Sequence, residues 1–357
     1  MNLTNKTIVK DLLKRREIKP EKYLGQHFIL SKKALARMVS AAEIEKNDTI
    51  IEIGPGLGTL TQELAKIPHP FSKGGGPKII AIEKDPKMIS ILKETLAGYK
   101  NIKIVQADAR NLWVSETHKF GGQKRAGAAF DGHKSAREKI RNQFFDRGEA
   151  EKYIEDFQLG IKIAKNKYKI VANLPYNVAT FLIRQWLDPP PSPGLRRARP
   201  ELMVLMIQKE VAQRICAKPR LRQGYGGQAP MNLLAVSIQF YADVKIIDYV
   251  QAEAFWPKPK VDSAIIKIVP KRSKRNDCFK PIGLKQSFAF FRIVKAGFSQ
   301  PRKQLIGNLM KKLKIPREKL IEIFKDLNIS EQVRAENLSL EQWVSLAISL
   351  QPNPQRK

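Results

Sequence analysis

The pattern of apolar and polar residues differs between the two parts of the chain. In the first part, short runs rich in β-branched residues alternate with longer amphipathic stretches, which predict strands and helices respectively. Strands are predicted over residues 49–53, 78–85, 101–108, 168–173 and 201–208, and helices from Thr59, over 86–97 and after residue 208. Such alternation is typical of right-handed βαβ units, so the pattern predicts a parallel sheet covered on both faces.

After about residue 278 only helical periodicity remains, as in "KQSFAFFRIVKAGF" and "LEQWVSLAISL". We therefore expect an α/β domain over residues 1–277 and a small all-α domain over 278–357. Segments rich in Gly, Pro or charged residues interrupt the α/β pattern near 68–77, 114–166, 189–200 and 219–230. We expect them to be surface insertions. The longest, 114–166, is expected to be solvated and partly disordered, with an RNA-contacting excursion as the alternative.

The charge of the chain restricts its partners. There are 65 Lys and Arg against 34 Asp and Glu, a formal net charge of +31. Excess charge of this size favours a polyanionic partner, either nucleic acid or an anionic membrane surface. No apolar run approaches the ~18–20 residues that span a bilayer, and the N-terminal residues contain no signal-peptide core. We expect a cytoplasmic protein that binds nucleic acid and no membrane.

Cysteine and histidine residues give no sign of a metal site or a disulfide framework. The two cysteines, Cys216 and Cys278, lack a CxxC partner, and the four histidines are scattered along the chain. We therefore expect no bound metal and no structural disulfide.

The glycines of "EIGPGLG", Gly54, Gly56 and Gly58, fall where the first predicted strand turns into a helix. Glycine permits positive φ and lets a ligand approach the bare backbone. Such a turn is compatible with a dinucleotide, with S-adenosylmethionine or with tight packing alone.

The next two strands end in acidic residues. Glu83 closes one strand and can accept hydrogen bonds from both hydroxyls of a ribose. Asp108 closes the other and can accept from the amino group of an adenine, while the small Ala109 leaves room for the ring. Each carboxylate alone could be a solvated strand end. The turn is Gly-x-Gly-x-Gly rather than Gly-x-Gly-x-x-Gly and there is no diphosphate pattern, so the set favours S-adenosylmethionine over NAD, which stays an alternative.

The strand from Tyr168 halts at "NLPY", which comprises Asn173, Leu174, Pro175 and Tyr176. The sequence Asn-x-Pro is common in turns, and a turn alone is the simpler explanation for the end of the strand. The residue types also suit methylation of an exocyclic amine, whose lone pair is delocalised into the ring. The Asn173 side-chain carbonyl and the Leu174 backbone carbonyl can hold the amine, Pro175 fixes the turn, and Tyr176 can stack on a base taken out of its helix.

These motifs resemble those of the KsgA-type ribosomal RNA adenine N6-dimethyltransferases. The resemblance rests on "NLPY", "EIGPGLG", "IEKD" and "QAD", and on "YLGQHFI" (23–29), "FWPKPKVDSAIIKI" (255–268) and "FRIVKAGFSQPRKQLIGNL" (291–309). It implies a Rossmann-like S-adenosylmethionine-dependent methyltransferase fold with a small helical C-terminal domain. It also implies that "GQHFI" closes over the cofactor, with His27 and Ile29 contributing contacts alongside Gly54, Glu83, Asp108 and Asn173.

The activity implied by the resemblance is the transfer of four methyl groups to two adjacent adenosines in the 3′-terminal hairpin loop of small-subunit (16S) ribosomal RNA. The implied partner is this RNA, or an immature 30S subunit during subunit biogenesis, and the implied state is a monomer. Two residues depart from the family pattern. His27 stands where Asn is common, although an imidazole can still donate a hydrogen bond. Pro301 stands where a basic residue is usual, which removes one phosphate contact.

Basic residues in the C-terminal half are the expected RNA contacts. Arg292, Lys295, Arg302 and Lys303 recur near the start of the helical domain, and "KRSKR" at 271–275 adds a cluster. Any one of them could be an ordinary solvated charge. Together they fit phosphate binding whose strength falls with salt.

Two other functions remain open on the sequence alone. One is the related methyltransferase that modifies large-subunit ribosomal RNA and gives macrolide resistance, against which Leu174, "KVDSA" and the long helical C-terminus argue. The other is a catalytically idle RNA-binding assembly factor. The set of Gly54, Glu83, Asp108 and Asn173 argues against it, because a scaffold need not hold cofactor acceptors.

Overall fold

The structure is a computed structural model, and it divides into two compact units. It describes residues 1–20, 26–45, 48–67, 77–116, 159–163, 168–187, 199–219, 230–271 and 284–350. The first unit comprises Met1–Gln208 and Ile247–Pro270, and the second comprises Lys209–Ile246 and Lys271–Lys357. The second unit thus includes a segment, Lys209–Ile246, that we assigned to the α/β domain. Most of the predicted insertions, including 117–158, lie outside the described residues.

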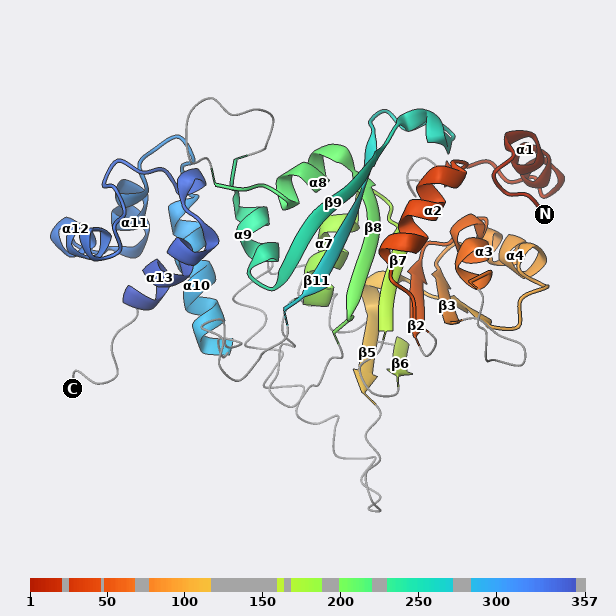
Figure 1. Ribbon diagram of the computed structural model, residues 1–357, viewed down its shortest axis with the longest axis horizontal. Coiled ribbons are helices and arrows are strands. Elements are labelled where there is room, and N and C mark those ends of the chain that lie inside the picture. The colour runs from red at the N-terminus through yellow and green to blue at the C-terminus, as the bar shows by residue number, and fades with distance from the viewer. Residues whose placement is uncertain are drawn as a thin grey trace, which may run out of the picture. The chain divides into compact units, whose positions relative to one another are not determined.

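The main sheet has seven strands (Figure 1). In spatial order they are β4 (Ile102–Gln106), β3 (Lys78–Glu83), β2 (Thr49–Ile53), β7 (Tyr168–Asn173), β8 (Leu202–Gln208), β11 (Ser263–Pro270) and β9 (Ala242–Val250). The first five pair in parallel, which confirms the five predicted strands.

Strand β11 is the exception to the predicted parallel sheet, because it runs antiparallel to β8. Ser263, its first residue, pairs with Gln208, the last residue of β8. Strand β11 therefore begins at the edge where β8 ends, and the chain reaches it from β9 through residues 251–262. Residues 263–270 were not among the predicted strands, and Ser263 lies at this edge of the sheet.

Helices of the first unit bury one apolar face each. They are α1 (Lys6–Arg15), α2 (Lys32–Ala41), α3 (Thr59–Ala65), α4 (Pro86–Thr95) and α7 (Ala179–Leu187). Helices α3 and α4 begin at the predicted residues, whereas α1, α2 and α7 were not predicted. Met38 of α2 and Leu64 of α3 share one buried cluster with Val171 of β7 and Val204 of β8. Each buried side chain of this kind contributes roughly 1.5–3 kcal/mol.

Two short strand pairs complete the first unit. Strand β1 (Phe28–Ile29) pairs antiparallel with β10 (Phe255–Trp256), which brings the motifs "GQHFI" and "FWPKPK" together although they lie far apart in the sequence. Strands β5 (Leu112–Glu116) and β6 (Leu159–Ile163) pair in parallel at the two ends of the long insertion. Two turns of 3₁₀ helix, η2 (Ala109–Asn111) and η3 (Ala252–Ala254), lie in this unit as well.

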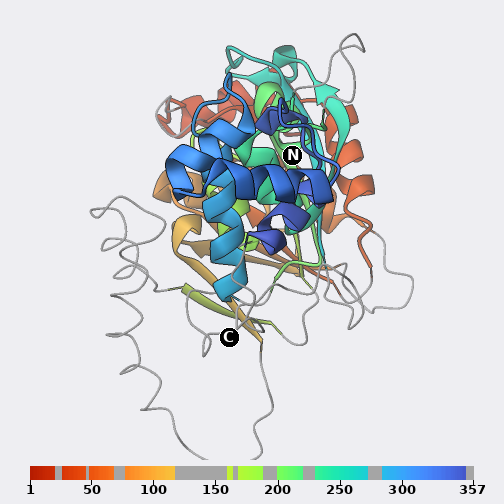
Figure 2. The same ribbon diagram turned by 90° about the vertical axis from the view of Figure 1, so that its left-hand side faces the viewer.

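Apart from the first residues of β9, the second unit is helical over the described residues (Figure 2). Its helices are α8 (Lys209–Ile215), α9 (Leu233–Gln239), α10 (Leu284–Gly297), α11 (Leu305–Leu313), α12 (Arg317–Asp326) and α13 (Leu340–Ser349), with the 3₁₀ turn η4 (Ala335–Asn337). Helices α10 and α13 meet at Gly297, where an added Cβ would come within 2.4 Å of the Trp343 ring. None of the helices over the described residues has the length and apolar character needed to cross a membrane.

A buried ion pair ties the loop before β2 to the sheet. Lys169 of β7 and Asp48 are 5% and 2% exposed, and Lys169 Nζ lies 2.8 Å from Asp48 Oδ2. Lys169 Nζ also donates a hydrogen bond to the Glu43 carbonyl oxygen. On β11, Lys267 is paired with the Glu43 carboxylate at 2.6 Å. The loop therefore depends on two lysines that are themselves buried in the sheet.

We predict that Asp48→Ala destabilises the protein by about 3–5 kcal/mol, because it leaves the Lys169 ammonium buried without its counterion. Thermal unfolding followed by circular dichroism measures the effect. The matched control is Glu253→Ala, which breaks the exposed pair with Lys258 and should leave the midpoint unchanged. Equal midpoints for the two variants would contradict the structural role of the buried pair.

Candidate active site

The glycine turn after β2 has the conformation that its sequence predicts. Gly54, Gly56 and Gly58 have φ angles of +65°, +57° and +87°. A Cβ on Gly56 would meet the Phe28 ring at 3.2 Å, so strand β1 lies directly against the turn. Any other residue type here would be strained by both conformation and contact.

Glu83 ends β3 and is held by backbone amides. Its Oε1 accepts hydrogen bonds from the amides of Lys84 (2.8 Å) and Asp85 (2.9 Å), and its Oε2 accepts from the amide of Gly56 (3.2 Å). Burial raises the pKa of Glu83, and the three amides offset part of that rise. The carboxyl group therefore has a fixed position beside the glycine turn.

Asp108, which lies two residues after β4 and caps η2, is engaged by two cations. Arg110 Nη2 donates to Asp108 Oδ2 at 2.6 Å, and Lys84 Nζ lies 3.0 Å from the same oxygen. Asp108 Oδ1 accepts from the backbone amide of Arg110 at 3.0 Å. Burial opposes ionisation, but the bonds from Arg110 and Lys84 outweigh it and hold the pKa of the carboxyl well below its usual range. Asp108 is thus an ionised acceptor that already has partners.

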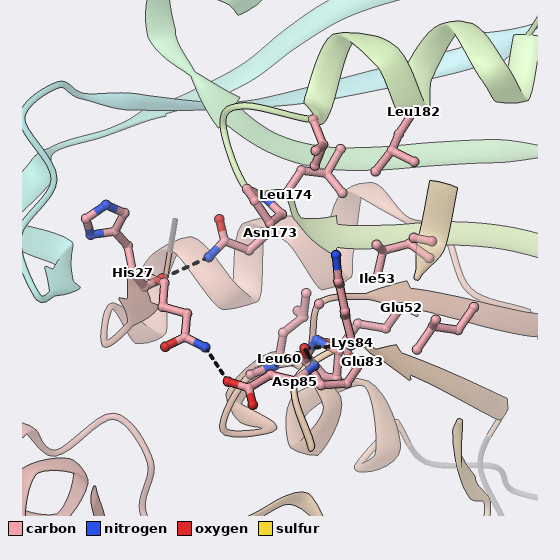
Figure 3. Close-up of a pocket in the computed structure, with 18 of the residues that line it drawn as sticks. His27, Glu52, Ile53, Leu60, Glu83, Lys84, Asp85, Asn173, Leu174 and Leu182 are labelled. Carbon is pink, nitrogen blue, oxygen red and sulfur yellow. Dashed lines mark hydrogen bonds between the residues drawn. The ribbon is translucent and has the colours of Figure 1, made fainter. Parts of the chain in front are cut away.

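Asn173 is oriented by the segment at β1. Its Nδ2 donates to the backbone carbonyl of His27 at 3.2 Å, as Figure 3 shows. Because a carbonyl only accepts, this bond fixes the amide nitrogen and directs Oδ1 the other way. His27 in turn donates from Nδ1 to the Pro257 carbonyl at 2.7 Å. The imidazole therefore donates a hydrogen bond, as predicted, but its acceptor lies within the protein.

Tyr176 is held on both its ring and its hydroxyl. The rings of His27 and Tyr176 are 5.9 Å apart at an angle of 26°, and the Tyr176 hydroxyl lies 2.8 Å from Ser263 Oγ. Burial raises the pKa of Tyr176, so the phenol stays protonated at neutral pH. The antiparallel course of β11 supplies Ser263 for this contact.

These residues surround one cavity of about 320 Å³. All the residues predicted for the cofactor or for catalysis line it, with the exception of Gly58, which instead caps α3: they are His27, Ile29, Gly54, Gly56, Glu83, Asp108, Ala109, Asn173, Leu174, Pro175 and Tyr176. In Figure 3, His27 and Asn173 lie on one side and Glu83 and Asp85 on the other. The volume falls within the range that small-ligand sites occupy.

Sequence reasoning missed seven charged or polar residues of the cavity wall, namely Gln26, Glu52, Thr59, Lys84, Asp85, Arg110 and Asn177. Four of them belong to the motifs quoted for the resemblance, so their position in the sequence could have drawn attention to them. The Gln26 side chain donates to Asp85 Oδ2 at 2.9 Å and links the segment before β1 to the turn after β3. That contact joins residues 59 positions apart, which no local pattern reveals.

The residues predicted to bind RNA lie in the second unit. Arg292 and Lys295 are exposed and three residues apart on α10, and Arg302 and Lys303 are exposed in the turn before α11. Pro301 is exposed beside them. The predicted cluster at 271–275 lies outside the described residues except for Lys271.

Known structures of similar fold were found among RNA methyltransferases. A dimethyladenosine transferase from Plasmodium falciparum superposes with a TM-score of 0.56 at 22% identity, over 90% of this chain and 96% of that one. The 23S rRNA methyltransferase ErmE gives the same TM-score at 20% identity, over 90% of this chain and 99% of that one. At these identities the likeness establishes the Rossmann-like methyltransferase fold, as expected from the sequence.

Relatives found by sequence have higher identities to this chain than these two solved structures. Ribosomal RNA small subunit methyltransferase A from Dehalococcoides mccartyi is 32% identical over 97% of this chain and 93% of its own length. The protein of the same name from Clostridium botulinum is 31% identical over 95% of this chain and 96% of its own length. The family model described as ribosomal RNA adenine dimethylase matches residues 18–352, which include both units. The chain therefore belongs to the ribosomal RNA adenine dimethylase family and is an enzyme.

Proposed function

We propose that this enzyme dimethylates N6 of two adjacent adenosines in the 3′-terminal hairpin loop of small-subunit ribosomal RNA, with S-adenosylmethionine as the methyl donor. The observation that supports this best is the single cavity that joins Glu83, Asp108 and the Asn173–Tyr176 turn. The names of the relatives at 30–32% identity, which refer to the small subunit, favour this RNA over that of the large subunit.

The residues present fit the proposed cofactor. Glu83 offers a buried, amide-held carboxyl group where ribose hydroxyls need an acceptor. The glycine turn offers backbone that a ligand can approach closely, and Ala109 leaves space beside Asp108 for a ring. When bound, S-adenosylmethionine supplies an electrophilic methyl group.

Asp108 can accept from the adenine amine only by sharing or exchanging its present partners. A carboxylate has about four acceptor positions, and Arg110 and Lys84 use most of them. Both cationic side chains are at least half exposed, so water can solvate them when they move away. Ionised Asp108 can then accept a hydrogen bond from the amino group of an adenine. A purine with a carbonyl oxygen at the same position would offer it no donor.

The Asn173–Tyr176 turn binds and orients the target base. Asn173 Oδ1 and the Leu174 carbonyl accept from the target amine and aim its lone pair at the methyl group, while the Tyr176 ring stacks on the extruded base. The His27 carbonyl keeps the Asn173 amide in the required orientation. The Ser263 contact keeps the Tyr176 ring in place. No strong base is needed, because orientation replaces activation of the nucleophile.

The proposed partner is small-subunit ribosomal RNA, free or in an immature 30S subunit, bound by a monomer in the cytoplasm. Support comes from the net charge of +31 and from the exposed basic residues on α10 and in the turn before α11. Phosphate contacts of this kind position the RNA and carry little sequence information. We therefore infer that the residues of the cavity, and not the phosphate contacts, select adenosine.

We predict that incubation with methyl-labelled donor and unmethylated small subunits yields N6,N6-dimethyladenosine at two adjacent positions. Digestion to nucleosides followed by chromatography identifies the product, and primer extension locates it. Large subunits incubated in parallel serve as the control. Label in the large subunit, or monomethylation at scattered sites, would contradict the proposed substrate.

We predict that Glu83→Ala weakens S-adenosylmethionine binding at least tenfold, because it removes a carboxyl acceptor for two hydroxyls. In contrast, Asn173→Ala should leave cofactor affinity within about threefold of the wild type and lower turnover at least 100-fold, because it removes an acceptor that orients the amine. Calorimetry and single-turnover methylation measure the two effects. Equal losses of cofactor affinity would refute this division of roles.

We predict that RNA binding weakens steeply with salt, and that the double variant Arg302→Gln, Lys303→Gln lowers the slope of log Kd against log salt by about 1–2. Fluorescence anisotropy with a labelled hairpin measures the slope. The control variant Lys319→Gln, Lys325→Gln removes the same charge from exposed positions of α12. A flat salt dependence in the wild type, or the same slope change in both variants, would count against a specific phosphate contact at 302–303.

A further inference from the structure

Helix α1 carries a row of lysines that the proposed function does not use. Lys6, Lys10 and Lys14 are exposed and lie four residues apart. Four residues advance a helix by about 6 Å and turn it by about 40° beyond one full turn, so the three side chains follow one side of α1. We name this set the α1 lysine row.

The apolar side of α1 is already occupied by packing. Val9, Leu12 and Leu13 are buried and share a cluster with Met88 and Ile91 of α4, beside which α1 lies in Figure 1. A helix that binds a membrane needs its apolar face free to enter the lipid. The exposed side of α1 therefore suits a polyanion rather than a lipid surface.

The charges of the α1 lysine row are not neutralised among the described residues. No ion pair there joins Lys6, Lys10 or Lys14 to a carboxylate, whereas the nearby Arg16 pairs with Glu94 of α4. Within α1 the sequence has one acidic residue, Asp11, which is also exposed. Positive charge thus exceeds negative charge on the exposed side of this helix.

The α1 lysine row lies close to the cavity wall. Phe28 of β1 and Leu57 of the glycine turn belong to the same buried cluster as the apolar residues of α1, and both also line the cavity. All of these residues belong to the first unit. An RNA strand that delivers a base to the cavity therefore passes within reach of long side chains packed around this wall.

We propose that the α1 lysine row is a second RNA-binding surface, which binds the phosphates of the strand next to the target adenosines. This rests on the proposed function, in which small-subunit ribosomal RNA is the substrate. The rise of about 6 Å between successive lysines is comparable to the separation of neighbouring phosphates along an RNA strand. Each lysine can therefore contact one phosphate as a point charge.

The α1 lysine row is distinct from the features by which the family was recognised. Helix α1 ends at Arg15, and the match to the family model begins at residue 18. Phosphate contacts position an RNA and carry little sequence information. The row should therefore strengthen substrate binding without taking part in methyl transfer.

The test compares two triple variants that remove the same charge from exposed positions of the first unit. One is Lys6→Gln, Lys10→Gln, Lys14→Gln, and the control is Lys78→Gln, Lys100→Gln, Lys103→Gln. Lys78 begins β3, whose other end is Glu83 at the cavity, and Lys103 is the second residue of β4. The control residues thus lie at the opposite edge of the sheet from the cavity.

Fluorescence anisotropy with a labelled 3′-terminal hairpin at several salt concentrations measures the effect. We expect the α1 variant to bind about tenfold more weakly at low salt, and the slope of log Kd against log salt to fall by about 2–3. The control should stay within about twofold of the wild type. In methylation of small subunits, the α1 variant should raise KM about tenfold and change kcat less than threefold, and replacing the three lysines with arginine should restore KM.

A second variant keeps the proposal testable if the triple variant does not fold, which circular dichroism shows. Asp11→Asn removes the one negative charge of α1 and should strengthen hairpin binding about two- to threefold, because that charge repels the phosphates. A loss of packing could not produce such a gain.

Equal affinities and slopes for the two triple variants, or weaker binding by Asp11→Asn, would overturn the α1 surface while leaving the proposed substrate intact. Vesicles of phosphatidylglycerol and phosphatidylcholine provide the other polyanion. If the α1 variant lost vesicle binding and kept hairpin binding, the surface would bind a membrane, and the proposal would be wrong. If the wild type did not bind the hairpin at all, the proposed substrate would fall together with the α1 surface.

Discussion

Strands β2, β3, β4 and β7 run parallel, and this places their carboxyl ends along one edge of the sheet. The arrangement of the cavity residues in the first unit depends on this parallel pairing. The glycine turn, Glu83, Asp108 and the Asn173–Tyr176 turn each follow a different strand, so pairing in register brings them around one cavity. Open α/β sheets bind ligands at this edge for the same reason, because the turns there are not covered by the crossover helices.

A second set of contacts comes from outside the parallel strands. The segment at β1 is paired with β10, and from this position the His27 carbonyl orients Asn173 while the His27 ring faces Tyr176. Strand β11, which runs back from the carboxyl end of β8, supplies Ser263 to the Tyr176 hydroxyl. The Asn173–Tyr176 turn is therefore held by contacts from two segments that are distant from it in sequence. Support of this kind is needed when catalysis relies on orientation.

The three carboxyl groups of the cavity differ in their electrostatic surroundings. Glu52 has no hydrogen-bond partner at Oε2 among the described residues, and burial raises its pKa to about 8. Glu83 is nearly as buried but is held by three backbone amides, which offset part of the rise in its pKa. Asp108 is less buried and is paired with Arg110 and Lys84, which lower its pKa. The same functional group can thus have its pKa raised or lowered, according to its depth and partners.

The sequence by itself determined the five parallel strands, the starts of α3 and α4, the helical C-terminal part and the positive-φ glycines, because these follow from local periodicity and backbone chemistry. It also pointed to Glu83, Asp108 and Asn173, because each closes a predicted strand. The antiparallel course of β11, the β1–β10 pair and the Gln26–Asp85 contact were decided only by the tertiary structure, since they join residues far apart in the chain. The same holds for the partners of Asp108 and for the buried state of Glu52. Charge and burial depend on which side chains pack together in space, and a strand pattern alone carries no information about that.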